Sequence, residues 1–312
     1  MLRPLPNRLT LLVLCLSQLV PSQTASANSL LELQHSISEQ EKRAGRVILE
    51  AGKRFFFVNP ESPRKTKISL VFVHGFSASS AELSPFPEIL AQHMEANLFL
   101  TRLSGHGIKG GDFTGVRYED WAQDLEEARR IGLAIGDSVV FLGSSTGSTL
   151  IADALIRNRL GIRAVVLASG NFGVAAWGAE WLTVPILGDL LRRVLVGKYR
   201  SFEPHSPRME KYWTTRYRSE AVTEVMRTVQ ITRSHRLEEI KVPALFLYSR
   251  HDRVLNLTET RKAYDRWGAK EKQYIEIRSA ERHVLAGSAA ESNGTEETLR
   301  ITESFLKRLG LN

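Results

Sequence analysis

Beyond about residue 50, short apolar runs alternate with longer amphipathic segments. The apolar runs are rich in β-branched and aromatic residues, which predicts strands. Several of them, such as Val165-Val166-Leu167, are solidly apolar rather than alternating, as is typical of parallel strands buried on both faces. The expected strands cover residues 55–58, 68–73, 97–101, 138–142, 164–168, 244–248 and 274–277.

Amphipathic segments between these runs predict helices. The first is marked by an apolar stripe from Leu30 to Ile48 and is expected from residue 30 to about residue 50. The others are expected at residues 85–94, 118–131, 148–158, 259–267 and 297–309. This alternation predicts an α/β fold, with a mostly parallel central sheet and helices on both faces.

The alternation stops over residues 172–235, which contain Trp177, Trp181 and Trp213 and no convincing strand. Ten Lys and Arg against six Asp and Glu make this stretch locally basic. We expect a helical insertion over residues 172–235 that divides one core into residues 28–171 and 236–312. In the loops above a parallel sheet, such an insertion would overhang the crevice where these sheets bind ligands.

The amino terminus follows another pattern. Arg3 and Arg8 precede an apolar run over residues 9–20, and Ala25-Ser26-Ala27 follows it. These features predict a signal peptide over residues 1–27, cleaved after Ala27, and therefore a secreted or periplasmic protein. The alternative is an uncleaved membrane anchor, although a run this short spans a bilayer poorly.

Composition adds few constraints. The chain has 312 residues, 43% hydrophobic and 24% charged, which is ordinary for a globular protein. Loss of the leader removes Arg3, Arg8 and the single cysteine, Cys15, and lowers the formal net charge from +8 to +6. The mature chain could then form neither disulfides nor thiolate metal sites. The basic excess permits peripheral contact with an anionic membrane, but a simple solubility charge is the favoured interpretation, and no nucleic-acid-binding motif occurs.

The candidate chemistry centres on Gly143-Ser144-Ser145-Thr146-Gly147, which matches G-x-S-x-G between an expected strand and an expected helix. A sharp strand-to-helix turn would expose the Ser145 hydroxyl above the sheet and place it at a helix amino terminus. The pattern alone is also compatible with an ordinary turn. A serine nucleophile needs a base and an acid to orient that base.

The best candidate base is His283, because it lies in the loop between the last expected strand and the last helix. The best candidate acid is Asp252, just after the expected strand at residues 244–248, with Glu281 in reserve. The alternatives are a solvated loop histidine and a turn or helix-capping aspartate. For the developing oxyanion, the expected donors are the backbone N–H groups of Phe76 and Thr146, and His74 is expected to orient the Phe76 loop.

Neither a cofactor nor a metal is expected. Residues 105–110 match G-x-G-x-x-G, but neither the helix nor the acidic residue of a dinucleotide site follows. The chain has no H-E-x-x-H or comparable metal-ligand cluster.

Taken in order, these residues resemble the α/β-hydrolase superfamily, in particular its monoacylglycerol-lipase and carboxylesterase-like branch, often called lysophospholipase-like. The resemblance covers about residues 68 to 310 and rests on short motifs: 73–76, 102–107, 118–121, 143–147, 252–254 and His283. It implies Ser145 as nucleophile, Asp252 as acid, His283 as base and a helical lid. Residues 172–235 match no pattern that we recognise, so the substrate stays open.

The sequence thus predicts an exported serine hydrolase that acts on a small-molecule ester or lipid through an acyl-enzyme. An amidase or peptidase on the same fold is one alternative, and a non-catalytic binding protein is another.

Overall fold

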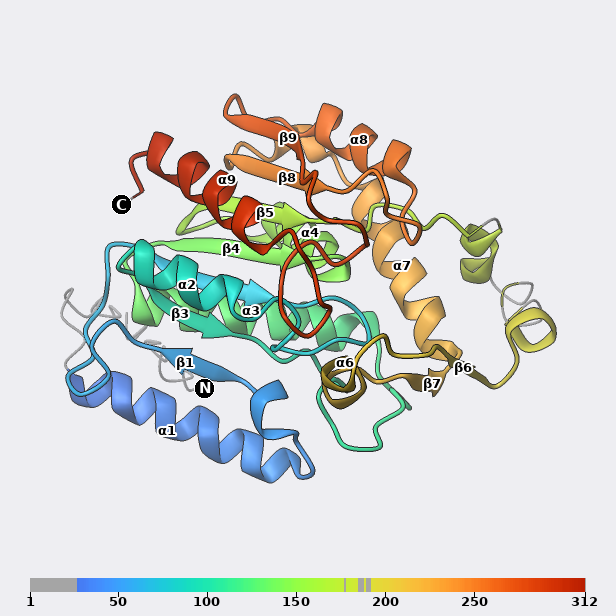
Figure 1. Cartoon of the computed structure of the whole chain (residues 1–312), viewed down its shortest axis with the longest axis horizontal. Coiled ribbons are helices and arrows are strands. Elements are labelled where there is room, and N and C mark those ends of the chain that lie inside the picture. Colours follow the sequence, from blue (N-terminus) through green and yellow to red (C-terminus); the bar gives the residue numbers. More distant parts are fainter. Residues whose placement is uncertain (1–26, 177, 185–187, 189–191, 312) are drawn as a thin grey trace, which may run out of the picture.

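A seven-stranded sheet forms the centre of the protein (Figure 1). The computed structural model describes residues 27–176, 178–184, 188 and 192–311. The sheet order is β1-β3-β2-β4-β5-β8-β9, in which β1 alone is antiparallel to its neighbour. The strands are β1 (Arg54–Phe56), β2 (Ser69–Val73), β3 (Asn97–Leu100), β4 (Val139–Ser144), β5 (Ile162–Ala168), β8 (Ala244–Tyr248) and β9 (Lys272–Glu276). The predicted mostly parallel sheet is confirmed.

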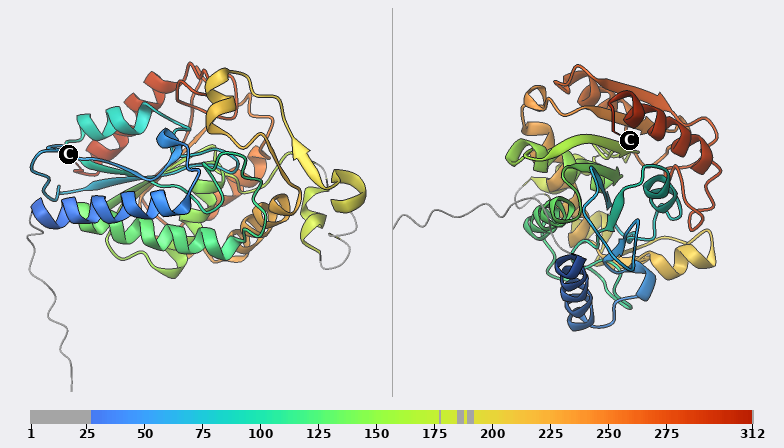
Figure 2. Two further views of the ribbon diagram at one scale, coloured as in Figure 1. Left: turned by 90° about the horizontal axis from the view of Figure 1, so that it is seen from below. Right: turned by 90° about the vertical axis from the view of Figure 1, so that its left-hand side faces the viewer.

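Helices cover both faces of this sheet (Figure 2, left). One face carries α1 (Ala27–Ala44), α3 (Tyr118–Ile135), α4 (Thr146–Arg157), α7 (Glu220–Ser234) and α8 (Leu257–Arg266). The other face carries α2 (Phe86–His93) and α9 (Thr295–Arg308). Strand β2 is buried throughout, with Val71 and Val73 in the first core and Leu70 and Phe72 in the second. A strand buried on both faces is apolar at nearly every position, which explains the solid apolar runs in the sequence.

The expected first helix is too long, and this expectation is corrected. Helix α1 ends at Ala44, because Gly45 and Arg46 both adopt positive φ, at 62° and 55°. The residues after α1 reverse direction, and Val47 forms an antiparallel bridge with Ile108. A short 3₁₀ turn, η1 (Leu49–Ala51), completes the connection to β1.

The segment between β5 and β8 is largely helical but also contains strands, so the expectation of no strand there is wrong. Its elements are η2 (Ala179–Thr183), a π-helical turn η3 (Arg192–Val196), β6 (Tyr199–Ser201), α6 (Pro207–Tyr212), β7 (Arg216–Arg218), α7 and a 3₁₀ turn η4 (Leu237–Glu239). Strands β6 and β7 form an antiparallel pair in which the Arg216 guanidinium lies 3.9 Å from the Tyr199 ring centroid. Such a stack stabilises a pair of three-residue strands that would be too short to recognise from hydrophobicity.

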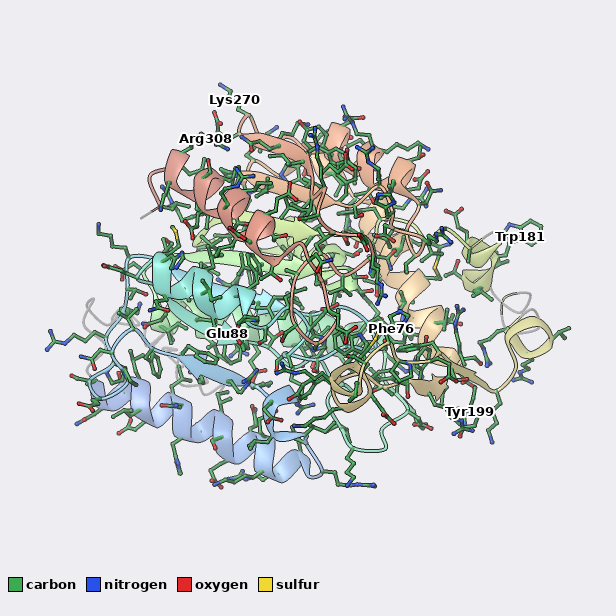
Figure 3. All side chains as sticks on the ribbon, viewed as in Figure 1. Phe76, Glu88, Trp181, Tyr199, Lys270 and Arg308 are labelled. Carbon is green, nitrogen blue, oxygen red and sulfur yellow. The ribbon has the colours of Figure 1, made fainter. Side chains whose placement is uncertain are left out.

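The three tryptophans of this segment differ in environment. Trp213 is buried, Trp181 is 54% exposed and projects away from the core (Figure 3), and Trp177 lies outside the described residues. The predicted leader also lies outside them, except for Ala27, where α1 begins. In the part of the chain that the structure describes, no helix combines the length and apolar character needed to cross a membrane.

Gly132 shows how tightly α3 packs on the sheet. A Cβ atom there would lie 2.8 Å from methyl groups of both Val71 and Val139. We predict that Gly132→Ala lowers the free energy of unfolding by about 1 kcal/mol. Overpacking costs about 1–3 kcal/mol and outweighs the helix-propensity gain of up to about 1 kcal/mol. Urea denaturation checks this, with the exposed Arg130→Ala as control. A stabilised Gly132→Ala variant would contradict the tight contact.

Candidate active site

Ser145 occupies the sharp turn between β4 and α4. Its φ and ψ are 50° and −116°, a strained conformation for a residue with a side chain. Its N–H donates to Ala168 O at 2.9 Å, and its carbonyl accepts from Asn171 N at 3.1 Å. These bonds to the end of β5 and the residues after it hold the strained backbone in place. Ser145 is 8% exposed.

Two glycines make this turn possible. A Cβ on Gly147 would lie 2.2 Å from the carbonyl oxygen of Val73, so only glycine lets α4 begin against the end of β2. A Cβ on Gly75 would lie 3.0 Å from Ser145 Cβ. The loop after β2 therefore lies directly against the candidate nucleophile.

Asp252 and His283 form a close pair. Asp252 follows β8 and His283 follows β9, and His283 Nδ1 donates to Asp252 Oδ2 at 2.7 Å. The other carboxylate oxygen of Asp252 accepts the N–H groups of Val254 and Leu255 at 2.8 and 3.1 Å. Burial opposes the charge on Asp252, but the hydrogen bond and charge of His283 and these two amides outweigh it and lower the Asp252 pKa.

Neighbouring strand ends hold the His283 loop. Ser169 Oγ donates to the carbonyl of His283 at 2.6 Å, and Ser249 Oγ donates to the carbonyl of Ala280 at 2.5 Å. Glu281, the reserve acid, is exposed, whereas Asp252 is buried beside His283. No hydrogen bond joins Ser145 Oγ to His283 in the described part of the chain, and such catalytic contacts often tighten only when substrate binds.

The two expected oxyanion donors are both available. Phe76 lies in the loop after β2, and Thr146 is the first residue of α4. Among the described residues, neither backbone N–H has a hydrogen-bond acceptor. The Thr146 amide also sits at the positive end of the α4 dipole.

Glu82 is a site residue that the sequence did not reveal. It is 2% exposed, and its Oε2 accepts the N–H of Gly75 at 2.7 Å. Burial raises the pKa of Glu82, against the opposing effects of the Gly75 amide, His283 and the Ser144 hydroxyl. An acidic residue in a serine-rich loop resembles a solvated surface group, and only the fold brings its distant partners together.

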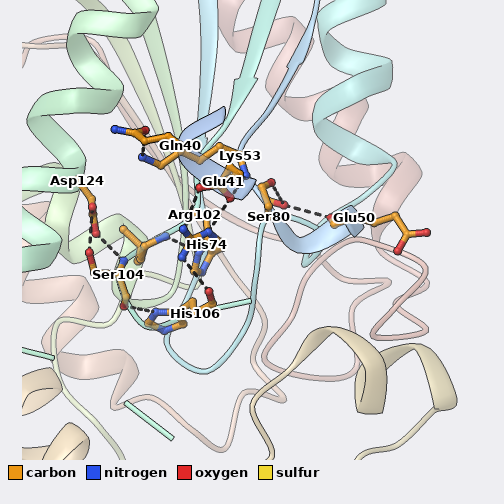
Figure 4. A network of polar contacts seen from close by, with 12 residues as sticks. Gln40, Glu41, Glu50, Lys53, His74, Ser80, Arg102, Ser104, His106 and Asp124 are labelled. Carbon is orange, nitrogen blue, oxygen red and sulfur yellow. Dashed lines mark hydrogen bonds and ion pairs between the residues drawn. The ribbon is translucent and has the colours of Figure 1, made fainter. Parts of the chain in front are cut away.

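Two buried histidines interlock the loops at residues 74–77 and 102–106, which we call the oxyanion loop and the support loop (Figure 4). His74 Nε2 accepts the N–H of Leu103 at 3.0 Å, and His106 Nε2 accepts the N–H of Ser77 at 3.1 Å. Their Nδ1 atoms face carbonyl oxygens of Gly75 and Ser104, so both rings are neutral with the proton on Nδ1. His106 was not expected at the site, because a histidine in a glycine-rich loop looks unremarkable in sequence.

The insertion also reaches the oxyanion loop (Figure 3). Thr214 N donates to Ser77 O at 2.7 Å, and the rings of Phe76 and Tyr217 meet edge to face at 5.0 Å. Phe113 joins this cluster, with its ring 5.0 Å from that of Phe76. An apolar aromatic wall therefore lies beside the candidate oxyanion donors.

Across residues 27–176, 178–184, 188 and 192–311, no three His, Cys, Asp or Glu side chains are grouped so as to hold a metal ion. The glycine-rich segment at 105–110 is a loop and opens no helix.

Together, the sheet order, the strained serine between β4 and α4, and the Asp252–His283 pair at the ends of the last strands define the class as an α/β-hydrolase. A family model described as serine aminopeptidase, S33, matches residues 64–286. The chain therefore belongs to this family of α/β-hydrolases. No curated protein matches its sequence.

Solved structures with this fold include several enzymes. A lipolytic enzyme derived from a metagenome, from work on LipS and LipT, has a TM-score of 0.69 and 18% sequence identity. The structural match covers 84% of this chain and 99% of that enzyme. The monoacylglycerol lipase of Paleococcus ferrophilus has a TM-score of 0.62 and 17% sequence identity, and the match covers 83% of this chain and 98% of that enzyme. A putative non-heme bromoperoxidase of Mycobacterium tuberculosis, BpoC, has a TM-score of 0.55 and 12% sequence identity, and the match covers 85% of this chain and 98% of that protein. Such low identities establish the shared fold and not the reaction.

The neutral histidines predict acid sensitivity. Burial lowers the pKa of His74 to about 4, aided by Arg102 and opposed by its bond to Gly75, whereas an unfolded histidine titrates near 6.5. Between these values the unfolded chain binds the proton first, so stability is full above about pH 6.5 and is lost as pH falls toward 4. His74→Gln keeps an acceptor for Leu103 and should lose about 3 kcal/mol less over this window than wild type.

Urea denaturation at several pH values measures this difference, and the exposed His35→Gln is the control. Identical pH slopes for wild type and His74→Gln would show that His74 is not held neutral.

Proposed function

We propose that the protein is an exported serine hydrolase that cleaves carboxylic esters through an acyl-enzyme. One observation carries the proposal: the Asp252–His283 pair lies at the same end of the sheet as a strained, glycine-flanked Ser145 with two unengaged amides beside it. Each of these groups has a role in acyl transfer.

In the proposed mechanism, Ser145 Oγ attacks the ester carbonyl carbon while its proton moves to Nε2 of His283. Asp252 holds the imidazole with its proton on Nδ1 and stabilises the imidazolium. The N–H groups of Phe76 and Thr146 receive the oxyanion. Collapse expels the alcohol, which takes the proton from His283, and water then releases the acid by the same steps in reverse.

The aromatic cluster of Phe76, Phe113 and Tyr217 beside the oxyanion donors supports an apolar acyl group, as in lipid and fatty esters, rather than a charged amino-terminal residue. Structural neighbours described as lipolytic enzymes and monoacylglycerol lipases agree with a small ester or lipid substrate. The family description favours an aminopeptidase as the second candidate. An aminopeptidase requires an anionic group that binds the ammonium group of its substrate. Glu82, an acid beside the oxyanion loop, does not supply this group, because it is buried and already accepts the Gly75 N–H.

The insertion at residues 172–235 is proposed to act as the lid and to contribute the substrate contacts. Thr214 and Tyr217 touch the oxyanion loop, which supports this role. Export rests on the leader predicted over residues 1–27, and peripheral membrane contact on the exposed Trp181 and Val194. Sequencing the amino terminus of the exported protein tests the cleavage after Ala27.

Ser145→Ala tests the nucleophile. We expect ester turnover to fall by at least about a thousandfold and fluorophosphonate labelling to disappear, because the attacking oxygen is gone. The matched control is Ser304→Ala, an exposed position on α9, on the outer side of the core. Full labelling of Ser145→Ala would refute the assignment, and faster cleavage of aminoacyl amides than of acyl esters by wild type would select the peptidase alternative.

Glu82 is predicted to position the oxyanion loop. Glu82→Ala leaves the Gly75 N–H without its acceptor, so kcat should fall about 10- to 100-fold with little change in KM. Glu82→Gln retains an acceptor oxygen and should recover most of kcat. The exposed Glu61→Ala serves as control. Equal losses in both Glu82 variants would show that its charge, rather than its hydrogen bond, matters.

A further inference from the structure

Helix α1 lies outside the region of the chain that the hydrolase family model matches. Helix α1 and the residues up to Lys53 precede the family match, which begins at residue 64. Nevertheless, these amino-terminal residues contact the support loop, which is hydrogen-bonded to the oxyanion loop of the candidate active site. Figure 4 shows the polar contacts that make this connection.

Glu41, near the end of α1, makes a two-pronged ion pair with Arg102. Arg102 Nε donates to Oε2 at 2.7 Å, and a terminal guanidinium nitrogen donates to Oε1 at 2.8 Å. Only 12% of the Glu41 side chain and 10% of the Arg102 side chain are exposed. The N–H of Lys53 donates a further bond to Oε2 at 2.9 Å. This geometry uses both carboxylate oxygens and fixes the plane of the guanidinium.

The other terminal nitrogen of Arg102 points along the support loop. It donates to the carbonyl of His106 at 3.2 Å. His106 in turn accepts the Ser77 N–H, and Leu103, beside Arg102, donates to His74. Hydrogen bonds thus connect Glu41 on α1 through Arg102 and His106 to Ser77, at one end of the oxyanion loop. The other end, at His74, is reached through Leu103, the chain neighbour of Arg102.

The residues after α1 reinforce the connection with backbone contacts. Ile48 N donates to Gly107 O, and Lys109 N donates to Arg46 O, both at 2.9 Å. Ser80 Oγ, three residues beyond the oxyanion loop, donates to Gly52 O at 2.8 Å. A Cβ on Gly107 would lie 2.7 Å from the carbonyl of Ala51, so no other residue allows so close an approach.

We propose that residues 27–53 form a brace that positions the oxyanion loop for catalysis, and that Glu41 is its principal positioning residue, acting through Arg102 and His106. Without the Glu41 carboxylate, a nearly buried guanidinium loses its counter-charge and must turn toward another acceptor. It would then leave the His106 carbonyl, and the Phe76 N–H would shift from the oxyanion position. The inference rests on the proposed serine hydrolase function.

Glu41→Gln tests the brace in the full chain, because it removes the charge and keeps the shape. We expect kcat to fall about tenfold, KM to stay within about twofold, and the fluorophosphonate labelling rate to fall in parallel, as follows from a small misplacement of an oxyanion donor. The matched control is Glu39→Gln on the same helix, whose exposed pair with Lys42 touches neither loop. Assays run well below each variant's melting temperature.

A double-mutant cycle with Arg102→Lys separates positioning from general destabilisation. Lysine loses both the two-pronged bond and the bond to His106, so the single variant should match Glu41→Gln and the double variant should be no worse. Additive losses would overturn the coupling. Glu41→Asp, which keeps the carboxylate, should recover part of kcat.

If these variants fold poorly, their backbone amide hydrogen exchange tests the positioning role instead of their activity. A positioning role predicts faster exchange confined to residues 74–80 and 102–109, whereas a uniform increase along the chain would overturn it. Wild-type labelling identifies which claim has failed. If wild type is labelled at Ser145 and Glu41→Gln is labelled at the wild-type rate, the brace is wrong. If Ser145→Ala is still labelled, the serine hydrolase function is wrong.

Discussion

The contact of Gly147 with the carbonyl of Val73 is the constraint on which the site depends. It sets the start of α4 directly against the end of β2, with no room for a side chain between them. The same closeness brings Gly75 against Ser145, so the two amides at Phe76 and Thr146 come from neighbouring backbones. An oxyanion hole requires donors fixed before reaction, and here backbone packing rather than side-chain choice fixes them.

Fixing that backbone requires buried polar groups, and each has a defined protonation state. His74 and His106 must be neutral to accept amide protons, and their burial favours this state. Asp252 must be charged to orient His283. Burial opposes this charge, but the hydrogen bond and charge of His283, together with two amide donors, outweigh burial and lower the Asp252 pKa. Burial thus favours the neutral form of all three groups, and only at Asp252 do the interactions with the charged form outweigh it.

The sequence predicted the sheet well because the central strands are mostly apolar runs, as at residues 244–248, which β8 matches. It also selected Asp252 and His283, and the fold brings these two side chains within hydrogen-bonding distance at one edge of the sheet. Their catalytic roles belong to the proposed function. It missed the end of α1, the β6–β7 pair and Glu82. These features depend on contacts between distant segments, such as Val47 with Ile108, Tyr199 with Arg216, and Glu82 with Gly75, which no local pattern encodes.

Two segments that are far apart in the sequence, residues 27–53 and the insertion at residues 172–235, converge on the oxyanion loop and its surroundings. The amino-terminal residues reach it through Gly52 and Ser80 and through Arg102, whereas the insertion reaches it through Thr214 and Tyr217. A loop held from both sides cannot adjust to one neighbour without straining the other, because packed interiors yield little. Any change in the insertion when substrate enters would therefore act on the position of Phe76, against a resistance set by the amino-terminal residues.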